Sequence, residues 1–567
     1  MTRNGSFFGD YDWRFLCTPP IPCKGGAQGQ PPFFGHADSV APFIVIIMGL
    51  QHSLAMVGAV IPAPLLVADA FNADLGPDQT QYLISAALIM TGISSFIQVS
   101  QIRIPYTKIV IGTGVVSMIG TALTFLPASV DALHQMRERP EFLDGNGDFD
   151  GRKGYGAILG TLLTGSFVQV ALAFISPKAL GWVFPPIVTG VTVFLIGTSL
   201  VGTGFKYWGG GAFCADNVNT DDPPLCTNNG DVELPFGSSQ YIGLGFSVFS
   251  VLVLLEVFGP PFMKSNNVVI ALVVGYVVAA SSSHEGNRYV VNDKIDAADN
   301  ITFLWVHTYP LSVYPPLLLP TILAYLVVGV KTIGDVTTTE EVSRLPMEGP
   351  EHFERVRGGL LSMGLTSLLS ALGTSLPNTT FSQNNGVIAL TRCASRMAGI
   401  ACCTWLILFG VLAKVAAFFT SIPDCVLGGM TTFLFANVAV SGVKIIASIK
   451  ITRRDRFIVA CSLGLGLGVT LVPAWVTNNL WNCSNCSVAL QSIRDSVILV
   501  MSTGYGVGCA TATLLNLVIP AQWDDDDPIA QAVAEENGAD VASGSTDIPV
   551  ITTLSDDSMV LEMKEDV

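Results

Sequence analysis

The sequence predicts an all-α polytopic membrane protein whose 14 membrane elements form a 7+7 inverted repeat. The first observation behind this prediction is composition: of 567 residues, 50% are hydrophobic and 13% are charged, and the mean hydropathy is +0.54. Soluble domains carry roughly 25% charged residues, so an ordinary soluble protein is excluded. The second is a series of apolar runs that approach the ~20 residues needed to cross a bilayer. The third is a pair of broken runs at matching places in that series.

The order of the apolar runs gives the predicted elements. Residues 1–40 are polar and rich in Gly and Pro, so we expect a cytosolic N-terminal tail without a cleavable signal peptide. The predicted spans lie near residues 41–61, 82–98, 155–175, 181–203, 238–258, 267–283, 312–330, 358–375, 398–420, 425–447, 457–473 and 495–519. Two further stretches, 109–126 and 380–396, are polar or Gly-rich where a spanning helix should be apolar. We expect both to be broken helices.

These two broken stretches are the third and tenth elements, which is the same position in each set of seven. An odd number of spans per half inverts the second copy of the repeat. Paired broken segments at corresponding positions are typical of the binding site of a secondary transporter. The 56 Gly residues agree with this class, because small residues allow membrane helices to approach closely.

The distribution of charge predicts the orientation of the chain. Lys and Arg are more frequent in the loops that the N-terminus-inside arrangement places in the cytosol, including the cluster at residues 450–456. Both termini are therefore expected in the cytosol. The formal net charge is −16, and residues 521–567 hold 13 acidic residues and one Lys. We expect residues 520–567 to be an acidic disordered tail, either simply solvated or bound by trafficking or turnover machinery. No segment of the sequence is basic enough to indicate binding of nucleic acid.

The cysteines predict one disulfide bond and no metal site. Cys214 and Cys226 fall in one predicted outside loop, and Cys483 and Cys486 fall in another, where a disulfide can persist. We predict the bond between Cys214 and Cys226. The second pair is a C-x-x-C motif without another such pair or a His pair nearby, so zinc is not expected.

The second broken stretch contains a cluster of side-chain amides, Gln383, Asn384 and Asn385, between Ser382 and Gly386. Amides present both donors and acceptors, so they can match the alternating carbonyl and N–H edge of a purine or pyrimidine without placing a charge in the membrane. Gly386 allows a close backbone approach. The alternative is that the amides join neighbouring helices. For a cluster inside a broken helix, we favour ligand binding.

The string QNNGVIALTR at residues 383–392 resembles the signature of the nucleobase-ascorbate transporter family. The pair Gln51-His52, the stretch TIGD at 332–335 and the stretch TTFLFANVAVSGVKII near the twelfth element add to the resemblance. The string WRFLCTP at 13–19 is similar to the fungal uric acid-xanthine permeases in particular.

This resemblance implies a division into two domains, an elevator motion and a homodimer in the plasma membrane. The core domain would comprise residues 41–175 and 312–420, and the gate domain residues 181–283 and 425–519. It also implies roles for individual residues. Gln383 would hydrogen-bond the base, with the Ser382 backbone amide beside it, and Asn384 would support transport. Other implied roles are affinity and specificity for Gly386, Thr391 and Arg392, bracing of the core for His52 next to Gln51, and substrate filtering for Tyr505.

Three positions depart from the family pattern. Lys331 stands where the family has a Glu that binds the base and belongs to its proton-coupled site, and Met363 stands where it has an Asp. Leu123 replaces an aromatic residue at a substrate-facing position. Loss of both acids removes the groups whose protonation would link proton movement to substrate binding.

A lysine near the bilayer midplane has few options. Lys331 could become neutral, pair with Asp335, meet an anionic ligand, or extend toward the cytosolic end of its helix. Glu256, alone in the sixth span, is either part of a structural ion pair or a replacement for the missing coupling acids.

The predicted function is secondary-active transport of purines of the xanthine and uric acid class, by proton-linked symport. Two alternatives remain: a diverged family member that carries another small ligand, such as an anion, without proton coupling, and a nucleobase sensor that does not transport. The sequence shows no combination of nucleophile, base and metal ligands that would indicate an enzyme, and no cofactor is expected. The expected partners are the small-molecule substrate, the lipid bilayer and a second copy of the chain.

Overall fold

The computed structural model describes residues 11, 13–18, 33–69, 72–107, 109–175, 185–218, 224–227, 230–291, 295–296, 298–347, 349–472, 475 and 488–520. The predictions for Cys483, Cys486 and the acidic tail from residue 521 onward lie outside these residues. The helices and strands below all belong to one compact unit, residues 1–519.

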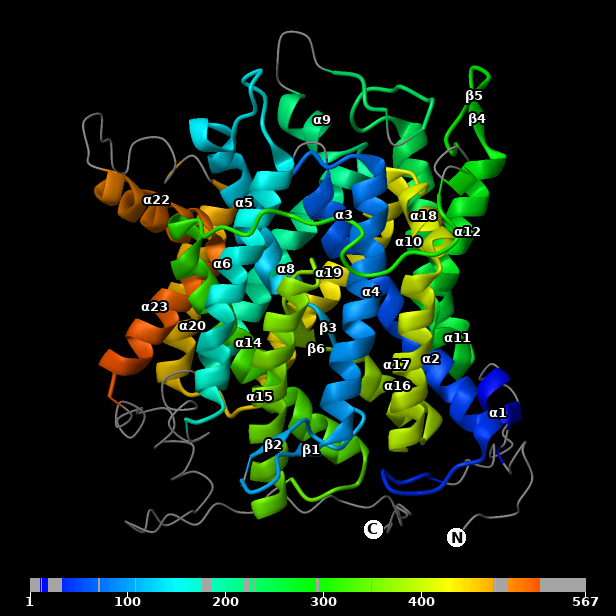
Figure 1. The fold of residues 1–567 in the computed structure, drawn as a ribbon, viewed down its shortest axis with the longest axis vertical. Helices are drawn as coiled ribbons and strands as arrows, with labels where there is room; N and C mark the ends of the chain where they lie inside the picture. Colours follow the sequence, from blue (N-terminus) through cyan, green and yellow to red (C-terminus); the bar gives the residue numbers. More distant parts are fainter. Residues whose placement is uncertain are drawn as a thin grey trace, which may run out of the picture. The chain divides into compact units, whose positions relative to one another are not determined.

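Helices make up most of this unit (Figure 1). In chain order they are α1 (Trp13–Cys17), α2 (Pro42–Val60), α3 (Pro62–Ala68), α4 (Pro77–Ser100), η1 (Leu123–Phe125), α5 (Leu126–Arg137), η2 (Pro140–Phe142), α6 (Gly151–Leu172), α8 (Pro186–Trp208), α9 (Ala212–Asn217), α10 (Ser239–Phe258), α11 (Pro261–Ser265), α12 (Asn267–Ser281), α14 (Pro315–Val342), α15 (Pro350–Leu372), α16 (Gln383–Thr391), α17 (Arg396–Val411), α18 (Ala413–Thr420), α19 (Asp424–Ala447), α20 (Arg453–Leu471), α22 (Val488–Ser502) and α23 (Gly504–Val518). The strands are β1 (Ile102–Arg103), β2 (Val110–Ile111), β3 (Ile119–Thr121), β4 (Ser283–His284), β5 (Asn287–Arg288) and β6 (Asn378–Thr380).

Many of these helices are suited to a membrane. Within the described residues, seven are long and apolar enough to cross a bilayer, or up to nine if each of two bent pairs is one span. The bent pairs are α17 with α18, at 72°, and the end of α22 with α23, at 92°. The sequence predicts each pair as one straight run, because hydropathy does not register a change of direction. The protein is a predominantly helical, multi-pass membrane protein.

The helix starts follow from local sequence. Proline occupies the first turn of α2, α4, α8 and α14, where its missing N–H costs nothing. At the start of α20, Thr452 and Asp455 form a reciprocal capping box. These signals place the starts of the helices near the loops between the predicted apolar runs.

The two broken stretches meet at the centre of the unit (Figure 1). Strand β3 of the third element pairs antiparallel with β6 of the tenth, with Gly120 opposite Thr379. The sequence predicts an all-α fold. The described residues are predominantly helical, but they also contain this strand pair and two other two-stranded pairs. The reason is that backbone groups inside hydrocarbon must be satisfied, and two helix breaks that face each other can satisfy one another.

Helix α14 is longer than predicted. The apolar run ends near residue 330, but the helix continues to Val342, which places Lys331 and Asp335 inside it. Threonine hydroxyls explain the extension: Thr332, Thr337 and Thr339 each donate to the carbonyl four residues earlier, at 2.7–2.9 Å. A helix whose polar side chains bond its own backbone can continue at a place where hydropathy alone predicts its end.

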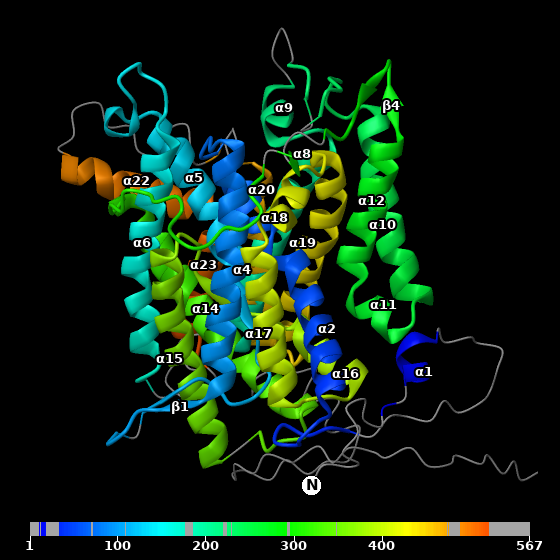
Figure 2. The ribbon, with the colours of Figure 1, turned by 45° about the vertical axis from the view of Figure 1, so that its right-hand side comes forward.

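The helices pack as two groups. In Figure 2, α10 and α12 of one group stand apart from α4 and α6 of the other. The first group comprises α2–α4, α6, α14, α15, α17 and α18, and the second comprises α8, α10, α12, α19, α20 and α23. Small residues make the closest contacts: a Cβ at Gly49 of α2 would lie 2.5 Å from Ala401 of α17, and one at Gly197 of α8 would lie 2.2 Å from Ala439 of α19. The strand pair β3–β6 lies within the first group, against α4, α14 and α15.

Candidate functional site

The β3–β6 pair fixes the start of α16. Phe381 N–H donates to the Met118 carbonyl at 2.9 Å, and Ala122 N–H donates to the Pro377 carbonyl at 2.8 Å. The chain then turns at Ser382 and enters α16. Backbone pairing with the third element therefore holds the polar stretch from Thr379 to Gly386 next to α14.

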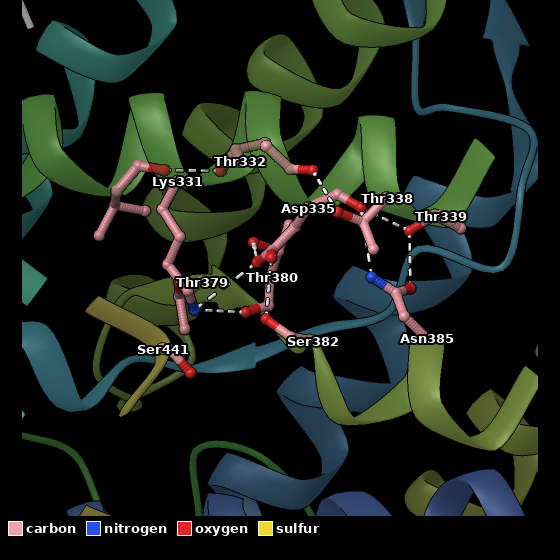
Figure 3. Close-up of polar contacts among 12 residues, drawn as sticks. Lys331, Thr332, Asp335, Thr338, Thr339, Thr379, Thr380, Ser382, Asn385 and Ser441 are labelled. Carbon is pink, nitrogen blue, oxygen red and sulfur yellow. Dashed lines mark hydrogen bonds and ion pairs between the residues drawn. The ribbon is translucent and has the colours of Figure 1, made fainter. Parts of the chain in front are cut away.

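Lys331 of α14 reaches this stretch (Figure 3). Its Nζ donates to the Thr380 carbonyl at 2.8 Å and to Thr379 Oγ1 at 3.3 Å, and it lies 3.7 Å from Asp335 Oδ2. The Lys331 side chain is 22% exposed and that of Asp335 is 15% exposed. Of the arrangements open to a membrane lysine, the structure adopts the pairing with Asp335.

Asp335 and Thr339 hold the first turn of α16 from the same face of α14. Asp335 accepts hydrogen bonds from Ser382 Oγ, at 2.8 Å, and from the Thr380 hydroxyl. One turn later, the single hydroxyl proton of Thr339 is shared between the Asp335 carbonyl, at 2.7 Å, and Asn385 Oδ1, at 2.8 Å. Residues 331, 335 and 339 follow each other at four-residue spacing, so they lie along one side of the helix (Figure 3). This side is the polar surface against which the broken element folds.

The two faces of α16 differ. Asn384 and Asn385 are buried, whereas Gln383 and Gly386 are exposed. A Cβ at Gly386 would meet no atom within 4 Å. Gln383 is therefore the exposed amide at the start of α16, and it directly follows Ser382, whose hydroxyl donates to Asp335. The predicted amide cluster divides into two amides that join helices, Asn384 and Asn385, and one that is exposed, Gln383.

Asn384 joins α16 to α2. Its Oδ1 lies 2.8 Å from His52 Nδ1, and both residues are fully buried. The other ends of these side chains, His52 Nε2 and Asn384 Nδ2, have no hydrogen-bond partner within the described chain, and neither do the amide atoms of Gln51. Buried polar atoms usually find partners, so bound water or a ligand group is expected here.

The remaining predicted residues lie apart from this site. Thr391 and Arg392 form the far end of α16, where Arg392 takes a left-handed conformation, with φ 58°, and its carbonyl accepts from Phe34 N–H at 2.9 Å. Leu123 is half-buried in η1, which contacts α14. Tyr505 is buried at the start of α23, in the second helix group. The predicted partners Cys214 and Cys226 are joined as a disulfide.

Sequence reasoning did not assign roles to Thr379, Thr380 and Thr339, and it placed Asn385 in the ligand-binding cluster, whereas its amide bonds α14. The signal was present in the repeated hydroxyls of the stretch Thr332–Thr339 and in the two threonines before Ser382. Hydroxyl-rich segments in an apolar run indicate bonding between elements as well as within one helix.

Three other features lie outside this site. A cavity of about 800 Å³ lies between α3, α9 and the start of α19, and none of the predicted binding residues lines it. At the end of α14, buried Glu340 binds His352 Nδ1 at 2.5 Å and Arg355 Nη1 at 3.1 Å. Glu256 is exposed near the end of α10 and accepts from Asn267 Nδ2 at 3.2 Å. In the described residues Glu256 makes no ion pair, contrary to the expectation of a structural one, because a neighbouring amide takes that place.

Comparison with known proteins gives one consistent result. Residues 43–475 match the model of a permease family. Over 528 residues, the chain is 43% identical to a purine permease and 43% identical to a uric acid-xanthine permease, both of Emericella nidulans; each alignment covers 93% of this chain and 90% of the relative. It is 31% identical over 474 residues to the xanthine permease XanP of Escherichia coli, covering 83% of this chain and 91% of that protein.

Solved structures agree at the level of the fold. The transmembrane domain of the cyanobacterial bicarbonate transporter BicA matches with a TM-score of 0.51 at 13% identity, covering 77% of this chain and 99% of that one. The murine anion transporter Slc26a9 in its inward-facing state matches with a TM-score of 0.52 at 12% identity, covering 74% and 64%.

Proposed function

This chain belongs to the permease family of nucleobase-ascorbate transporters, and from that premise we propose that it carries purines of the xanthine and uric acid class across a membrane. It is a transporter and not an enzyme. The alignments with a purine permease and a uric acid-xanthine permease cover nearly the whole length of this chain, which supports the same class of substrate here.

One observation carries the assignment of the site. Gln383 and Gly386 are exposed on the first turn of α16, while Asn384 and Asn385 beside them are buried against α2 and α14. A Gln amide offers a donor and an acceptor together, which matches the adjacent N–H and carbonyl groups of an oxidised purine. The partial positive charge of the helix start also favours the ring carbonyl oxygens. We assign Gln383 to base recognition, and Gly386 to the space that the ring needs.

The mechanism that we propose is an elevator built on the predicted 7+7 repeat. Two features support it: β3 and β6, from the third and tenth elements, pair antiparallel, and the helices pack as two groups. The first group, which holds the site, would be the moving core, and the second would be the gate. Tyr505 of the gate would filter substrates, and Leu123 would line the core side.

The setting of the carrier is also a proposal. We place it in the plasma membrane as a homodimer with both termini in the cytosol. Exposed apolar side chains on α10, including Phe246, Leu254 and Phe258, support a face that is covered by lipid or by a second copy. The acidic tail would contact trafficking or turnover machinery.

Proton-linked symport is the coupling that the family resemblance implies, and it needs a carboxylate that can bind and release a proton. In this site the carboxylate is Asp335, which is already engaged by Lys331, Ser382 and Thr380. That observation favours a second candidate, a carrier without proton coupling. A sensor that binds but does not transport is the third.

Uptake of radiolabelled xanthine and uric acid by fungal cells that lack their own purine permeases tests the proposal. We expect uptake by the wild-type chain, loss of uptake in Gln383→Ala, and full uptake in the matched control Gln240→Ala, which changes a half-buried Gln near the start of α10. Surface localisation is checked for each variant. Full uptake by a correctly localised Gln383→Ala protein would refute the site. Binding without uptake would identify a sensor.

A further inference from the structure

The ammonium group of Lys331 is surrounded by oxygen atoms. A backbone carbonyl, a hydroxyl and a carboxylate contribute them: Thr380 O at 2.8 Å, Thr379 Oγ1 at 3.3 Å and Asp335 Oδ2 at 3.7 Å. Carbonyl, hydroxyl and carboxylate oxygens are also the ligands that hard metal cations prefer. The Lys331 Nζ therefore occupies a place whose chemistry suits a small cation.

The position of this oxygen set in the fold is informative. Thr379 and Thr380 belong to β6, the unwound part of a broken element, and Asp335 belongs to the helix beside it. In carriers with discontinuous helices, unwound carbonyls at such breaks coordinate the coupling ion next to the substrate. Here Ser382, which also binds Asp335, directly precedes Gln383. The candidate cation position and the proposed substrate position are neighbours.

The local charge is balanced without an added ion. In the described part of the chain Lys331 forms one ion pair, and its partner is Asp335. No charged residue occurs in β3, β6 or α16. The buried residue Met363 of α15 is also uncharged. The helices packed against α14 carry other titratable groups, including Asp131 of α5 and His352 and Arg355 of α15. His352 and Arg355 bind Glu340, which lies nine residues beyond Lys331 on α14, about 14 Å along the helix axis.

We propose that the Lys331 ammonium is a covalently attached cation that fills the position of a coupling ion, so that substrate moves down its own gradient without co-transported H⁺ or Na⁺. This inference rests on the proposed transport function. It also means that Lys331, whose charge is matched by Asp335, does not serve as the binding group for an anionic ligand. Removing the ammonium leaves Asp335 and the oxygens around it open to Na⁺ or to a proton.

Purified full-length protein in proteoliposomes provides the test, with radiolabelled xanthine and an inward gradient of H⁺, of Na⁺, or of neither. For the wild type we expect a final inside-to-outside concentration ratio of about 1 in all three conditions, since a carrier without a coupled ion only equilibrates a neutral solute. Coupling to one proton would allow accumulation of up to about tenfold per pH unit. Accumulation of severalfold by the wild type under either gradient would overturn the inference.

Three variants sharpen the test. Lys331→Met removes the charge and keeps an unbranched chain, so we expect uptake that rises severalfold with Na⁺ or with external acid. Lys331→Arg keeps the cation, and its uptake should stay independent of both gradients. The double variant Lys331→Met with Asp335→Asn removes both charges, and it should lose the ion dependence of the single variant. Gradient-independent uptake by Lys331→Met would overturn the inference.

Thermal unfolding keeps the test decisive if a variant does not transport. Lys331→Met should gain stability from NaCl relative to choline chloride if Na⁺ binds, or from acidic pH relative to the wild type if a proton binds, since a ligand that binds the folded state raises Tm. Absence of both effects would contradict the inference. A wild type that neither binds nor takes up xanthine or uric acid would refute the proposed function instead, and the unfolding measurement would still report on the cation position.

Discussion

The two helix breaks are structural partners with unequal chemistry. Both contribute three residues to the central strand pair, and both lead into a short helix. The third element continues with Ala122 and Leu123, which pack in the apolar core, whereas the tenth continues with Ser382, Gln383 and Asn384. Pairing of the breaks satisfies the backbone of both, but only the tenth element brings side-chain amides and hydroxyls. The pairing therefore supplies the scaffold, and the tenth element with α14 supplies the site.

The charged pair on the tenth-element side should show the largest effect on stability. Asp335→Asn leaves the Lys331 ammonium without its counter-charge. Breaking a buried pair costs about 3–5 kcal/mol, and because these side chains are 22% and 15% exposed we expect about 2–3 kcal/mol, read as a lower Tm in detergent. The double variant with Lys331→Met should recover most of that loss. A double variant no more stable than Asp335→Asn would contradict the pairing.

A matched glycine pair compares the two breaks directly. A Cβ at Gly120 in β3 would lie 2.9 Å from side-chain atoms of Phe381 and Thr91, whereas one at Gly386 would meet nothing within 4 Å. We expect Gly120→Ala to destabilise by up to about 2 kcal/mol through overpacking. Gly386→Ala should leave Tm unchanged or higher and weaken xanthine binding. Equal Tm losses in the two variants would contradict the difference in packing between the two breaks.

Neighbouring amides in α16 should separate stability from binding. Asn384→Ala leaves His52 Nδ1 buried without its partner. We expect this to lower the free energy of unfolding by about 1–2 kcal/mol, which is measured as a lower Tm. Gln383→Ala removes an exposed amide and should keep the wild-type Tm while it abolishes purine binding. If Gln383→Ala unfolds as early as Asn384→Ala, then Gln383 is a structural residue and the division of α16 into two faces fails.

The smallest expected effect lies outside the membrane spans, at His36 before α2. Burial, with the Arg355 and Arg396 guanidinium groups nearby, lowers the pKa of His36 below its usual 6.5. The unfolded chain then binds more protons than the folded chain below about pH 6.5, so acid reduces stability as pH falls through that range. His36→Gln should make the loss of Tm between pH 7 and pH 5.5 slightly smaller. An unchanged Tm profile would contradict this contribution.

Much of the helix order could be predicted, because span length and hydropathy are local properties of the chain. The two breaks could also be located, since polar and glycine residues interrupt the apolar runs at 109–126 and 380–396. The length of α14 could not, because its threonines bond their own helix. The pairing of β3 with β6 joins residues more than 250 positions apart, and no local pattern specifies such a contact.

The site was predicted as a set of residues but not as an arrangement. Adjacent side chains on a helix point about 100° apart, so Gln383 and Asn384 could not both face the ligand. Which of them is buried depends on His52, from a helix 332 positions earlier. The partner of Lys331 also depended on a tertiary contact, since the Thr380 carbonyl becomes available only where β6 interrupts the helix.

A structure of the full-length protein determined with xanthine bound tests the central claim most directly. We predict the purine beside the first turn of α16, with its ring edge within hydrogen-bonding distance of the Gln383 amide and its plane close to Gly386, while Lys331 keeps its contact with Asp335. A purine seated instead in the cavity of about 800 Å³ between α3, α9 and the start of α19, away from Gln383, would contradict the account.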